Sequence, residues 1–393
     1  MRAAQFHAAG DIRIEDIPAP KPDNYENKVL IEVEWCGICG SDLNEYLHGP
    51  FAIPHEKKGP HPLTNALLPL PLGHEFSGRI SHIPSSISFS NPTLKKGQAV
   101  VIDPRYYCSS CSPCSQSATN SCDKLGFMGI SGKWGGLSEI VAVDLDHLYI
   151  LPETLCNGEE LDLAAAALIE PLAVAWHGVK LFISIAPYQI NNPGTNTEDD
   201  MASTPVLVIG AGPVGVATVF VLRARGAKTI FVSETSRARR DMLSDTGIVT
   251  NVFNPLTDDI PKHIKDATGD GVAAVFDCAG AQGGFDAGCA SLRFRGVYVN
   301  LALPKTPITI PIMPFLWKEI MYKCSLAYDE VDFGETVDAF VSGRFKGVEK
   351  MITRRLDLDD IVEKGFKELI KPNDHIKILA TPRRGVIKPE IVI

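Results

Sequence analysis

The segment Val206–Gly215, VLVIGAGPVG, most constrains what this chain can fold into. An apolar run leads directly into Gly210, Gly212 and Gly215, which have the spacing G-x-G-x-x-G, and a helix-favouring stretch follows. Further apolar runs alternate with helical stretches as far as residue 303. Strands separated by helices form a parallel sheet with right-handed crossovers. We therefore predict an α/β fold with a Rossmann-type, doubly wound parallel sheet in this part of the chain.

The three glycines predict a dinucleotide-binding turn when they are taken with their surroundings. The pattern alone is weak, because a glycine-rich turn can be purely structural. Here Gly210 would permit a tight turn, Gly212 would let the backbone approach a pyrophosphate, and Gly215 would let helix and strand pack closely. Pro213 and Val214 begin the helix, whose unpaired N–H groups would face the anion. All five are candidate cofactor-binding residues.

Glu234 ends the next apolar run, 19 residues after Gly215. In the dinucleotide-binding fold, the residue at the end of this strand contacts the adenosine ribose. A carboxylate would accept hydrogen bonds from the ribose hydroxyls and would repel a 2′-phosphate, which favours NAD over NADP. Arg239, with Arg237 and Arg240 beside it, is also a candidate cofactor contact and leaves some use of NADP open.

A second motif is formed by cysteines that lie close together in the chain. Cys108, Cys111, Cys114 and Cys122 follow the pattern C-x2-C-x2-C-x7-C. Four thiolates on one short loop can close a tetrahedron around Zn²⁺ with no open position, which is typical of a structural site. An iron–sulfur cluster is the rival interpretation, and four unliganded thiols are a third. We predict a structural zinc, since nothing else in the sequence indicates electron transfer.

The rest of the chain has a different character from the alternating region. The first 150 residues contain short apolar runs such as KVLIEVEW, FSGRISHI and QAVVIDP between turn residues, which predicts an irregular β-rich domain. From Leu161 an alanine-rich run predicts one or two buried helices. Residues 189–204 have the composition of a loop, and the last 70 residues predict amphipathic helices and a closing strand.

Three further residues are possible metal ligands, but they are scattered along the chain. Cys39 lies in WCGICGSD, His74 in LGHEF and Glu170 in IEPLA. Each has an ordinary explanation: a buried thiol, a hydrogen-bonded core histidine and a carboxylate at the end of a helix. Spacing alone does not bring them together.

Taken in order, the motifs resemble a known family. GICGSD, GHEFSG, the four-cysteine loop, the EP pair and VLVIGAGPVG occur in the order seen in zinc-containing medium-chain alcohol dehydrogenases. The similarity covers nearly the whole chain. Within that family GPHPLTNALLPLPLGHEFSG, MITRRLDLDDIVEKGF and HIKILATP look most like the 2,3-butanediol dehydrogenase group, with sorbitol and other polyol dehydrogenases next. The resemblance implies a GroES-like catalytic, zinc-binding domain over residues 1–174 and 324–393, and a Rossmann dinucleotide-binding domain over 175–323.

The resemblance also implies a set of catalytic residues. Cys39, His74 and Glu170 would bind a catalytic zinc, with Glu170 in the place where better-known members have a second cysteine. Glu75 follows His74 and is a possible further ligand or would hold a water. Asp42 is similar to the family's carboxylate that orients a ligand imidazole.

A proton relay is implied next to that metal. Ser41 resembles the hydroxyl that receives the alcohol's proton and passes it to the nicotinamide ribose; SDLNEY could also use this serine as a helix cap, and the two roles can coexist. Many relatives have a histidine three positions later, whereas this chain has Asn44. An amide does not take up a proton near neutral pH. The relay would therefore end through water, or through Glu45 or His48 if either points inward.

The implied activity is hydride transfer between NAD(H) and a secondary alcohol/ketone pair, with two zinc ions per chain, one catalytic and one structural. Butane-2,3-diol and acetoin are the leading substrates, and a sorbitol or xylitol type of polyol is the alternative. A catalytically silent relative that binds a dinucleotide and acts as an interaction protein is an alternative of another class. Relatives form homodimers or homotetramers, so a homo-oligomer is expected.

Composition excludes several other partners. The net charge is −9 with no long run of one sign, so neither a nucleic acid nor an anionic membrane surface is an expected partner. No stretch of eighteen apolar residues occurs, and the N-terminus MRAAQFHAAGDIRIED lacks the apolar core of a secretory signal. We expect a cytoplasmic enzyme whose ten cysteines are reduced thiols or metal ligands.

Overall fold

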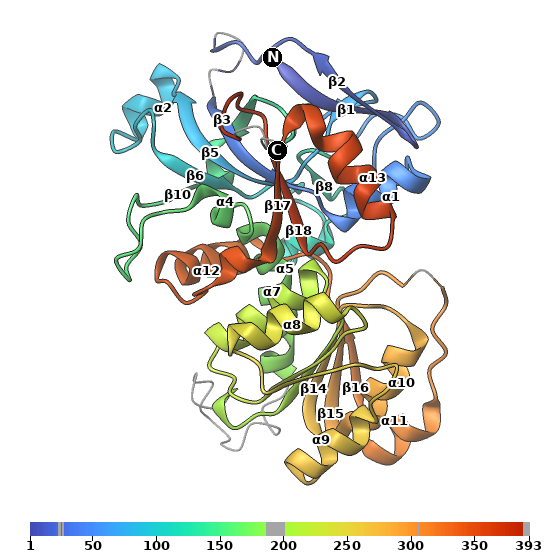
Figure 1. Cartoon of the computed structure of the whole chain (residues 1–393). Helices are drawn as coiled ribbons and strands as arrows, with labels where there is room; N and C mark the ends of the chain where they lie inside the picture. The colour runs from blue at the N-terminus through green and yellow to red at the C-terminus, as the bar shows by residue number, and fades with distance from the viewer. Residues whose placement is uncertain (23–24, 26, 186–200, 305, 388–393) are drawn as a thin grey trace, which may run out of the picture. The chain divides into compact units, whose positions relative to one another are not determined.

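The computed structural model describes residues 1–22, 25, 27–185, 201–304 and 306–387. Contacts between residues divide the chain into two compact units (Figure 1). The first unit comprises Met1–Glu170, Asp329–Gly343 and Ile352–Ile393, and the second comprises Pro171–Tyr328 and Arg344–Met351. Most of the segment predicted as a loop, residues 189–204, lies outside the described residues.

The first unit is built around one mixed sheet. Its strands follow the order β10-β6-β5-β3-β18-β17, and β9 also pairs with β3. The bounds are β3 Lys28–Gly37, β5 Glu75–His82, β6 Ala99–Ile102, β9 Ile140–Asp144, β10 Leu148–Ile150, β17 Ile352–Asp357 and β18 Lys377–Thr381. The three β-like runs predicted in the first 150 residues are β3, β5 and β6, so those predictions are confirmed.

Smaller elements complete the first unit. A second sheet has the order β2-β1-β4, with β1 Arg2–Ala8, β2 Asp11–Asp16 and β4 Leu70–Pro71, and a short hairpin joins β7 Arg105–Tyr106 to β8 Gly126–Phe127. The helices are α1 Gly40–His48, α2 Ser85–Ser90, α3 Ser112–Ser115, α4 Leu163–Ala166 and α12 Glu330–Val341. The 3₁₀ helices are η2 Thr119–Ser121, η3 Leu145–His147 and η5 Leu358–Asp360. A continuous apolar core, which includes Val33, Phe76 and Ile378, holds the strands together.

The second unit is the predicted doubly wound sheet. Its strand order is β13-β12-β11-β14-β15-β16, and every neighbouring pair is parallel. The bounds are β11 Val206–Ile209, β12 Ile230–Ser233, β13 Asn251–Phe253, β14 Val272–Asp277, β15 Leu292–Asn300 and β16 Met321–Cys324. This parallel pairing confirms the prediction of a parallel sheet. The central strands are buried on both faces, as is usual where crossover helices cover a parallel sheet.

Helices cover both faces of this sheet. They are α7 Pro213–Ala224, α8 Arg237–Thr246, α9 Ile260–Thr268, α10 Gln282–Ser291 and α11 Ile312–Lys318, and η4 Val348–Met351 also belongs to this unit. Figure 1 shows α7 and α8 to one side of the sheet and α9, α10 and α11 to the other. The alanine-rich run predicted as one or two helices forms two, α4 and α5 (Ile169–Ile185).

One predicted helix has a different form. The last 70 residues were expected to contain amphipathic helices, but the stretch LDDIVEKGFKELIK within them forms η5, a π-helical turn η6 (Ile361–Phe366) and a short α13 (Lys367–Ile370). Gly365 packs so closely that a Cβ atom there would lie 2.8 Å from Cδ1 of Ile38. A side chain at this turn would therefore press on the end of the Ile38 side chain.

Two further observations concern the whole described chain. None of its helices is both long and apolar enough to cross a membrane. All ten cysteines lie within the described residues and are free thiols.

Candidate active site

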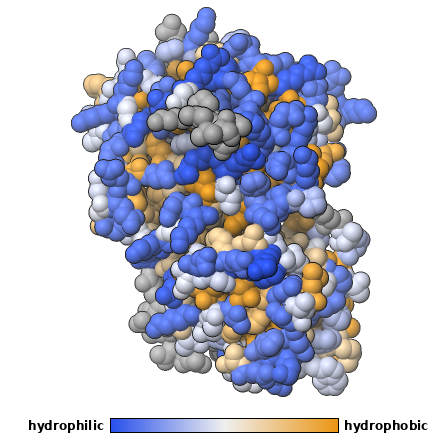
Figure 2. Space-filling view, in the orientation of Figure 1, coloured by the Kyte–Doolittle hydropathy of each residue, from blue (hydrophilic) through white to orange (hydrophobic). Residues whose placement is uncertain are grey.

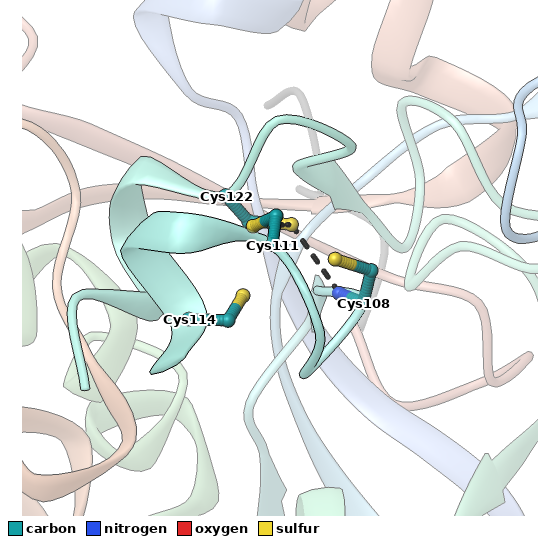
Figure 3. Close-up of side chains that lie close together, drawn as sticks. All are labelled: Cys108, Cys111, Cys114 and Cys122. Atoms are coloured by element: carbon teal, nitrogen blue, oxygen red, sulfur yellow. Dashed lines mark hydrogen bonds between the residues drawn. The ribbon is translucent and has the colours of Figure 1, made fainter. Parts of the chain in front are cut away.

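The four-cysteine loop brings its thiols together. One ligand atom from each of Cys108, Cys111, Cys114 and Cys122 lies within 4.8 Å of the others. Figure 3 shows the four sulfur atoms converging on one small space. The backbone N–H groups of Cys108 and Lys124 each donate to Sγ of Cys122 at 3.3 Å. These four residues are therefore placed as a tetrahedral thiolate site requires.

Ionisation in this cluster is uneven, which fits a group of thiols that needs a cation. Hydrogen bonds from the backbone and side chain of Ser110 lower the pKa of Cys108 to about 6. Burial, followed by hydrogen bonds with the thiols of Cys111 and Cys122, raises the pKa of Cys114 to about 12. Four thiols this close do not all ionise without a positive charge among them, and a bound Zn²⁺ would supply it.

A second site begins at the junction of β3 and α1. Cys39 is the N-cap residue of α1, and its backbone N–H donates to Oδ2 of Asp42 at 3.0 Å. A thiol at a helix N-terminus is favoured as the thiolate, since the helix dipole is positive there. Ser41 lies inside the first turn, so the interpretation of Ser41 as the helix cap is wrong: Cys39 occupies that position.

His74 faces this junction with each ring nitrogen next to a side chain of α1. Its Nδ1 lies 3.4 Å from Oδ1 of Asp42, and its Nε2 lies 3.3 Å from Oγ of Ser41. Burial lowers the pKa of His74, but the charges of Asp42 and then Cys39 outweigh burial and raise it well above its ordinary value. Asp42 therefore orients both the residue at the start of α1 and the imidazole, as a carboxylate behind a metal ligand does.

The two candidate carboxylates occupy different places. Within the described residues, the cluster with all ligand atoms inside 4.8 Å contains Cys39, His74 and Glu75. Glu170 is also buried, in the first turn of α5, and lies close enough to Lys377 for its charge to raise the pKa of that lysine. Thiolate, imidazole and carboxylate are the donor types that zinc takes in proteins, so these residues fit that metal.

The residues considered for the proton relay also have definite positions. Asn44 and His48 are exposed on α1. Glu45 is buried, and its carboxylate accepts hydrogen bonds from the backbone N–H groups of Phe51 at 2.8 Å and Ala52 at 2.6 Å. Glu45 thus fixes the loop after α1.

In the second unit, the glycines of the β11–α7 turn have the properties that a dinucleotide site needs. Gly210 has φ +88°, a conformation that favours glycine, and a Cβ atom at Gly215 would lie 1.8 Å from the carbonyl oxygen of Gly210. Gly212 caps α7 and has open space where a Cβ atom would stand, and Pro213 begins the helix ahead of Val214. The turn therefore leaves room for a phosphate at a helix N-terminus.

Glu234 is tied to this turn. Its Oε2 accepts from the backbone N–H of Ala211 at 2.6 Å, and its Oε1 accepts from that of Ser236 at 2.7 Å. Oε1 also accepts from Oγ1 of Thr235 at 3.2 Å, so Oε2 is the oxygen that retains a lone pair for a ribose hydroxyl. Arg240 donates to the carbonyl oxygens of Glu234 and Thr235, at 2.9 and 2.6 Å.

The two other arginines differ in their surroundings. Arg237 is exposed beside Asp241, with 3.6 Å between its Nε and a carboxylate oxygen. The backbone N–H of Arg239 donates to Oγ of Ser236, which caps α8.

Sequence reasoning missed two buried charged groups. Lys377, at the start of β18, binds the carboxylate of Glu75 with Nζ–Oε distances of 2.8 and 2.6 Å. Arg105 is fully buried beside the four-cysteine loop, where it donates to both oxygens of Asp103 and to Oγ1 of Thr119. A lysine that directly precedes a short apolar run, as in KILAT, is the sequence signal for this residue.

Comparison with known proteins agrees with this geometry over both units. Residues 25–153 match the alcohol dehydrogenase GroES-like domain, and residues 213–342 match the zinc-binding dehydrogenase domain. The chain therefore belongs to the zinc-binding alcohol dehydrogenase family of medium-chain dehydrogenases. It is a zinc-dependent oxidoreductase that interconverts alcohols and ketones with a nicotinamide cofactor. The alternative of a catalytically silent relative is set aside by these matches.

Individual relatives are similar over nearly their full length. The (R,R)-butanediol dehydrogenase of Saccharomyces cerevisiae is 34% identical, covering 97% of this chain and 98% of that protein. The crystal structure of 2R,3R-butanediol dehydrogenase from Bacillus subtilis has a TM-score of 0.82 and 33% identity, covering 97% of this chain and 99% of that one. D-xylulose reductase A of Aspergillus oryzae is 30% identical, covering 94% of this chain and 93% of that protein.

Proposed function

We propose that this enzyme interconverts butane-2,3-diol and acetoin with NAD(H). The observation that carries the metal chemistry is the placement of His74, whose Nδ1 lies 3.4 Å from Oδ1 of Asp42 and whose Nε2 lies 3.3 Å from Oγ of Ser41, in a cluster of possible ligands with Cys39 and Glu75. The substrate follows from similarity to two proteins named for butanediol. We also propose that residues 1–174 and 324–393 form the catalytic, metal-binding domain and residues 175–323 the dinucleotide-binding domain.

The proposed mechanism assigns each residue a task. Cys39, His74 and Glu170 would hold the catalytic zinc, which when bound supplies a Lewis acid that lowers the pKa of an alcohol hydroxyl. Asp42 would keep the proton of His74 on Nδ1, so that the Nε2 lone pair faces the metal. Ser41 would accept the alcohol's proton on Oγ while its own hydroxyl proton passes to the nicotinamide ribose. Asn44 is exposed and does not titrate, so water would carry the proton to solvent.

The substrate is tested by measuring NAD-linked kcat/KM across the stereoisomers of butane-2,3-diol, sorbitol, xylitol and simple secondary alcohols. A butanediol isomer is expected to have the highest value. The second candidate function, oxidation of a polyol such as sorbitol or xylitol, is favoured by the similarity to D-xylulose reductase A. A higher kcat/KM for a polyol than for every butanediol isomer would replace the first proposal by the second.

We propose NAD as the preferred cofactor because the Glu234 carboxylate lies at the glycine-rich turn. A 2′-phosphate beside it would meet a like charge, and such contacts cost several kcal/mol when solvent is excluded. Glu234→Ser should narrow the ratio of kcat/KM for NAD over that for NADP. The same variant loses the hydrogen bond to Ala211, so both cofactors should bind more weakly. Equal kcat/KM with NAD and NADP in the unaltered enzyme would contradict the proposal.

We propose that the cysteines Cys108, Cys111, Cys114 and Cys122 hold a second, structural zinc. The four sulfur atoms leave no position for a substrate, and the cluster is anchored from outside. Thr119, which lies in the same loop, accepts from Arg105 at 3.1 Å and donates to Glu330 at 2.7 Å. The loop is therefore tied to β7 and to α12 of the same unit.

We propose that the enzyme is a homo-oligomer that uses an apolar surface of the second unit. The visible face of the molecule is mostly hydrophilic (Figure 2). Large apolar side chains are nevertheless exposed on α11, on β16 and next to them: Ile310, Ile312, Met313, Leu316, Trp317, Met321, Tyr322 and Leu326. We call this set the α11–β16 patch. The strand β16 ends the sheet in the described chain and offers unpaired backbone groups.

A second copy of the chain fits this patch, because an edge strand can pair with its own symmetry mate and extend the sheet across a twofold axis. A dimer by this route, or a tetramer of such dimers, would cover the apolar side chains. Trp317→Glu should yield monomers in light scattering after gel filtration, whereas Leu256→Glu, at a leucine exposed elsewhere, should leave the mass unchanged. A monomeric unaltered enzyme would contradict the proposal.

We propose the cytoplasm as the compartment, because two zinc sites built on thiolates need reduced cysteines. All ten cysteines are free, in agreement with that expectation. Fractionation of cells that express the tagged protein tests it, and recovery of the protein in an oxidising compartment would contradict it.

A further inference from the structure

The loop that follows β14 lies beside the glycine-rich turn that follows β11. From β11 the chain extends the sheet to one side through β12 and β13, and then to the other side through β14, β15 and β16. In such sheets ligands bind where the strand order reverses, beyond the carboxyl ends of the two central strands. The backbone N–H of Cys278 donates to the carbonyl oxygen of Ile209 at 2.9 Å. A Cβ atom at Gly210 would lie 3.1 Å from Cβ of Ala279. Residues 278–280 therefore border the same place as the turn.

Asp277, the last residue of β14, fixes this loop with a buried carboxylate. The residue is only 2% exposed. Its Oδ1 accepts hydrogen bonds from the backbone N–H groups of Ala279 at 2.9 Å and Gly280 at 3.0 Å. One side chain thus sets the orientation of two successive peptide groups beside the glycine-rich turn.

Tyr298, on the neighbouring strand β15, holds the other oxygen of this carboxylate (Figure 1). Its hydroxyl donates to Oδ2 of Asp277 at 2.9 Å. The tyrosine is fully buried, and the ring centroids of Phe285 and Tyr322 lie 4.9 and 5.5 Å from its own. Burial, followed by the charge of Asp277, raises the pKa of Tyr298, so the hydroxyl keeps its proton and stays a donor at neutral pH.

The surroundings of Asp277 are costly for a carboxylate. Within the described part of the chain, its hydrogen bonds come from two backbone N–H groups and one hydroxyl, and no salt bridge joins it to a cation. A buried charge without a cationic partner is unfavourable unless hydrogen bonds compensate it. An apolar residue would fill this position of the strand at less cost if packing were its only task. The carboxylate therefore serves the loop that it holds.

We propose that Asp277 is a positioning residue for the nicotinamide cofactor: together with Tyr298 it holds residues 278–280 beside the glycine-rich turn, so that the dinucleotide binds between two preformed loops. This inference rests on the proposed dinucleotide site at that turn. Asp277 acts through the loop, since its own oxygens are buried and engaged. A loop that is already ordered costs no further entropy when the cofactor binds, so loosening it should weaken the affinity for NAD(H).

The experiment measures the Kd of NADH by fluorescence titration, together with kcat and both KM values, in Tyr298→Phe and Asp277→Ala. Tyr298→Phe removes one hydrogen bond to a charged group and should raise the Kd of NADH and the KM for NAD by about 10-fold. Asp277→Ala also frees two backbone N–H groups and should raise both by about 100-fold. In both variants, kcat at saturating NAD should not fall and the KM for alcohol should stay unchanged, because only cofactor binding is altered.

Two control variants separate positioning from other roles. Asp277→Asn keeps an acceptor for both backbone N–H groups, and its amide can donate to the Tyr298 hydroxyl, so its Kd for NADH should stay within about 3-fold of that of the unaltered enzyme. Ser291→Ala removes a buried hydrogen bond, 2.7 Å long, to the carbonyl oxygen of Ala287, next to the opposite end of the sheet. It should lower the Tm about as much as Tyr298→Phe does and leave the Kd of NADH unchanged.

Three results would overturn the inference: Tyr298→Phe and Asp277→Ala bind NADH as tightly as the unaltered enzyme, Asp277→Asn binds it as weakly as Asp277→Ala, or Ser291→Ala weakens it as much as Tyr298→Phe. The proposed dinucleotide site is tested separately by Gly212→Ala. A Cβ atom fits there in the free protein but would occupy the place of the pyrophosphate, so NADH should bind more weakly. Unchanged binding in Gly212→Ala would refute the site itself, so the two failures are distinguishable.

Discussion

The two candidate metal sites are built in different ways. In the four-cysteine loop, all ligands come from residues 108–122, three of the four thiols are partly exposed, and backbone N–H groups are the main neighbours. In the other site, the candidate ligands come from the β3–α1 junction, the start of β5 and the start of α5. Its His74 and Glu170 are buried, its Cys39 is partly exposed, and further charged side chains surround it.

The difference teaches what an open metal site requires. Four thiolates fill the coordination positions of Zn²⁺, so the loop needs no ligand from other segments. The candidate catalytic site has fewer anionic ligands, so the charged side chains next to it must each be held in place by a partner. Asp42 does this for His74 by a 3.4 Å contact, and Lys377 does it for Glu75 by two hydrogen bonds. We therefore expect changes at the two sites to affect different properties.

The largest expected effect is that of Cys39→Ser on catalysis. Loss of the thiolate should release the catalytic zinc and lower kcat/KM by at least ~10³-fold, since the metal's Lewis acidity is worth several kcal/mol. The variant should retain one zinc per chain. Kinetics combined with elemental analysis check this, and a variant that keeps both its activity and its full zinc content would exclude Cys39 as a ligand.

Ser41→Ala should have the next largest effect and separates metal binding from proton transfer. Loss of general acid–base assistance should slow alcohol oxidation by about 10²–10⁴-fold, with the zinc content unchanged. Ser41→Thr keeps the hydroxyl and serves as the control. If Ser41→Ala oxidised alcohol as fast as the unaltered enzyme, the relay would begin elsewhere.

Cys111→Ser should act on stability and not on the chemical step. Loss of the structural zinc should lower the free energy of unfolding by ~2–3 kcal/mol. Because each kcal/mol changes Tm by about 2–4 °C in domains of this size, Tm should fall by roughly 5–10 °C. The kcat of the folded fraction should change little. Calorimetry and active-site titration check this, and an unchanged Tm would show that the loop is stable without metal.

The smallest expected effect concerns Asn44. Asn44→His places a titratable group near the start of the proposed relay, so it should raise the oxidation rate modestly or add a titration near pH 6.5 to the rate profile. No change is expected if NADH release limits turnover. Asn44→Ala tests whether the residue only maintains local structure. Loss of zinc in that variant, with an unchanged pH profile for Asn44→His, would refute a relay role at this position.

Parts of the fold and of the sites followed from local sequence patterns. Apolar runs interrupted by helical stretches were enough to predict the parallel sheet, and the spacing of four cysteines was enough to predict that they meet. The glycine-rich turn was also predictable, since Gly210 and Gly215 are required by backbone conformation and close packing. In each case the interacting residues are close in the chain or follow a regular period.

Other parts depended on contacts between distant segments. Only the family resemblance predicted that Cys39 and His74 lie close together. The pairing of Glu75 with Lys377 joins residues 302 positions apart across β3, and no spacing rule anticipates it. The helix cap at Cys39 and the loop-fixing role of Glu45 also depend on side-chain direction, which composition does not reveal.

The most direct test of the account is the loss of zinc from the active enzyme in the presence of a chelator. Zinc per chain and NAD-linked activity are measured together over time. We predict two zinc ions per chain at the start, with the first lost rapidly and in proportion to activity, and the second retained in folded, inactive protein. Fully active enzyme with one zinc per chain or fewer, or loss of both ions together with unfolding, would contradict the distinction between an open catalytic site and a closed structural one.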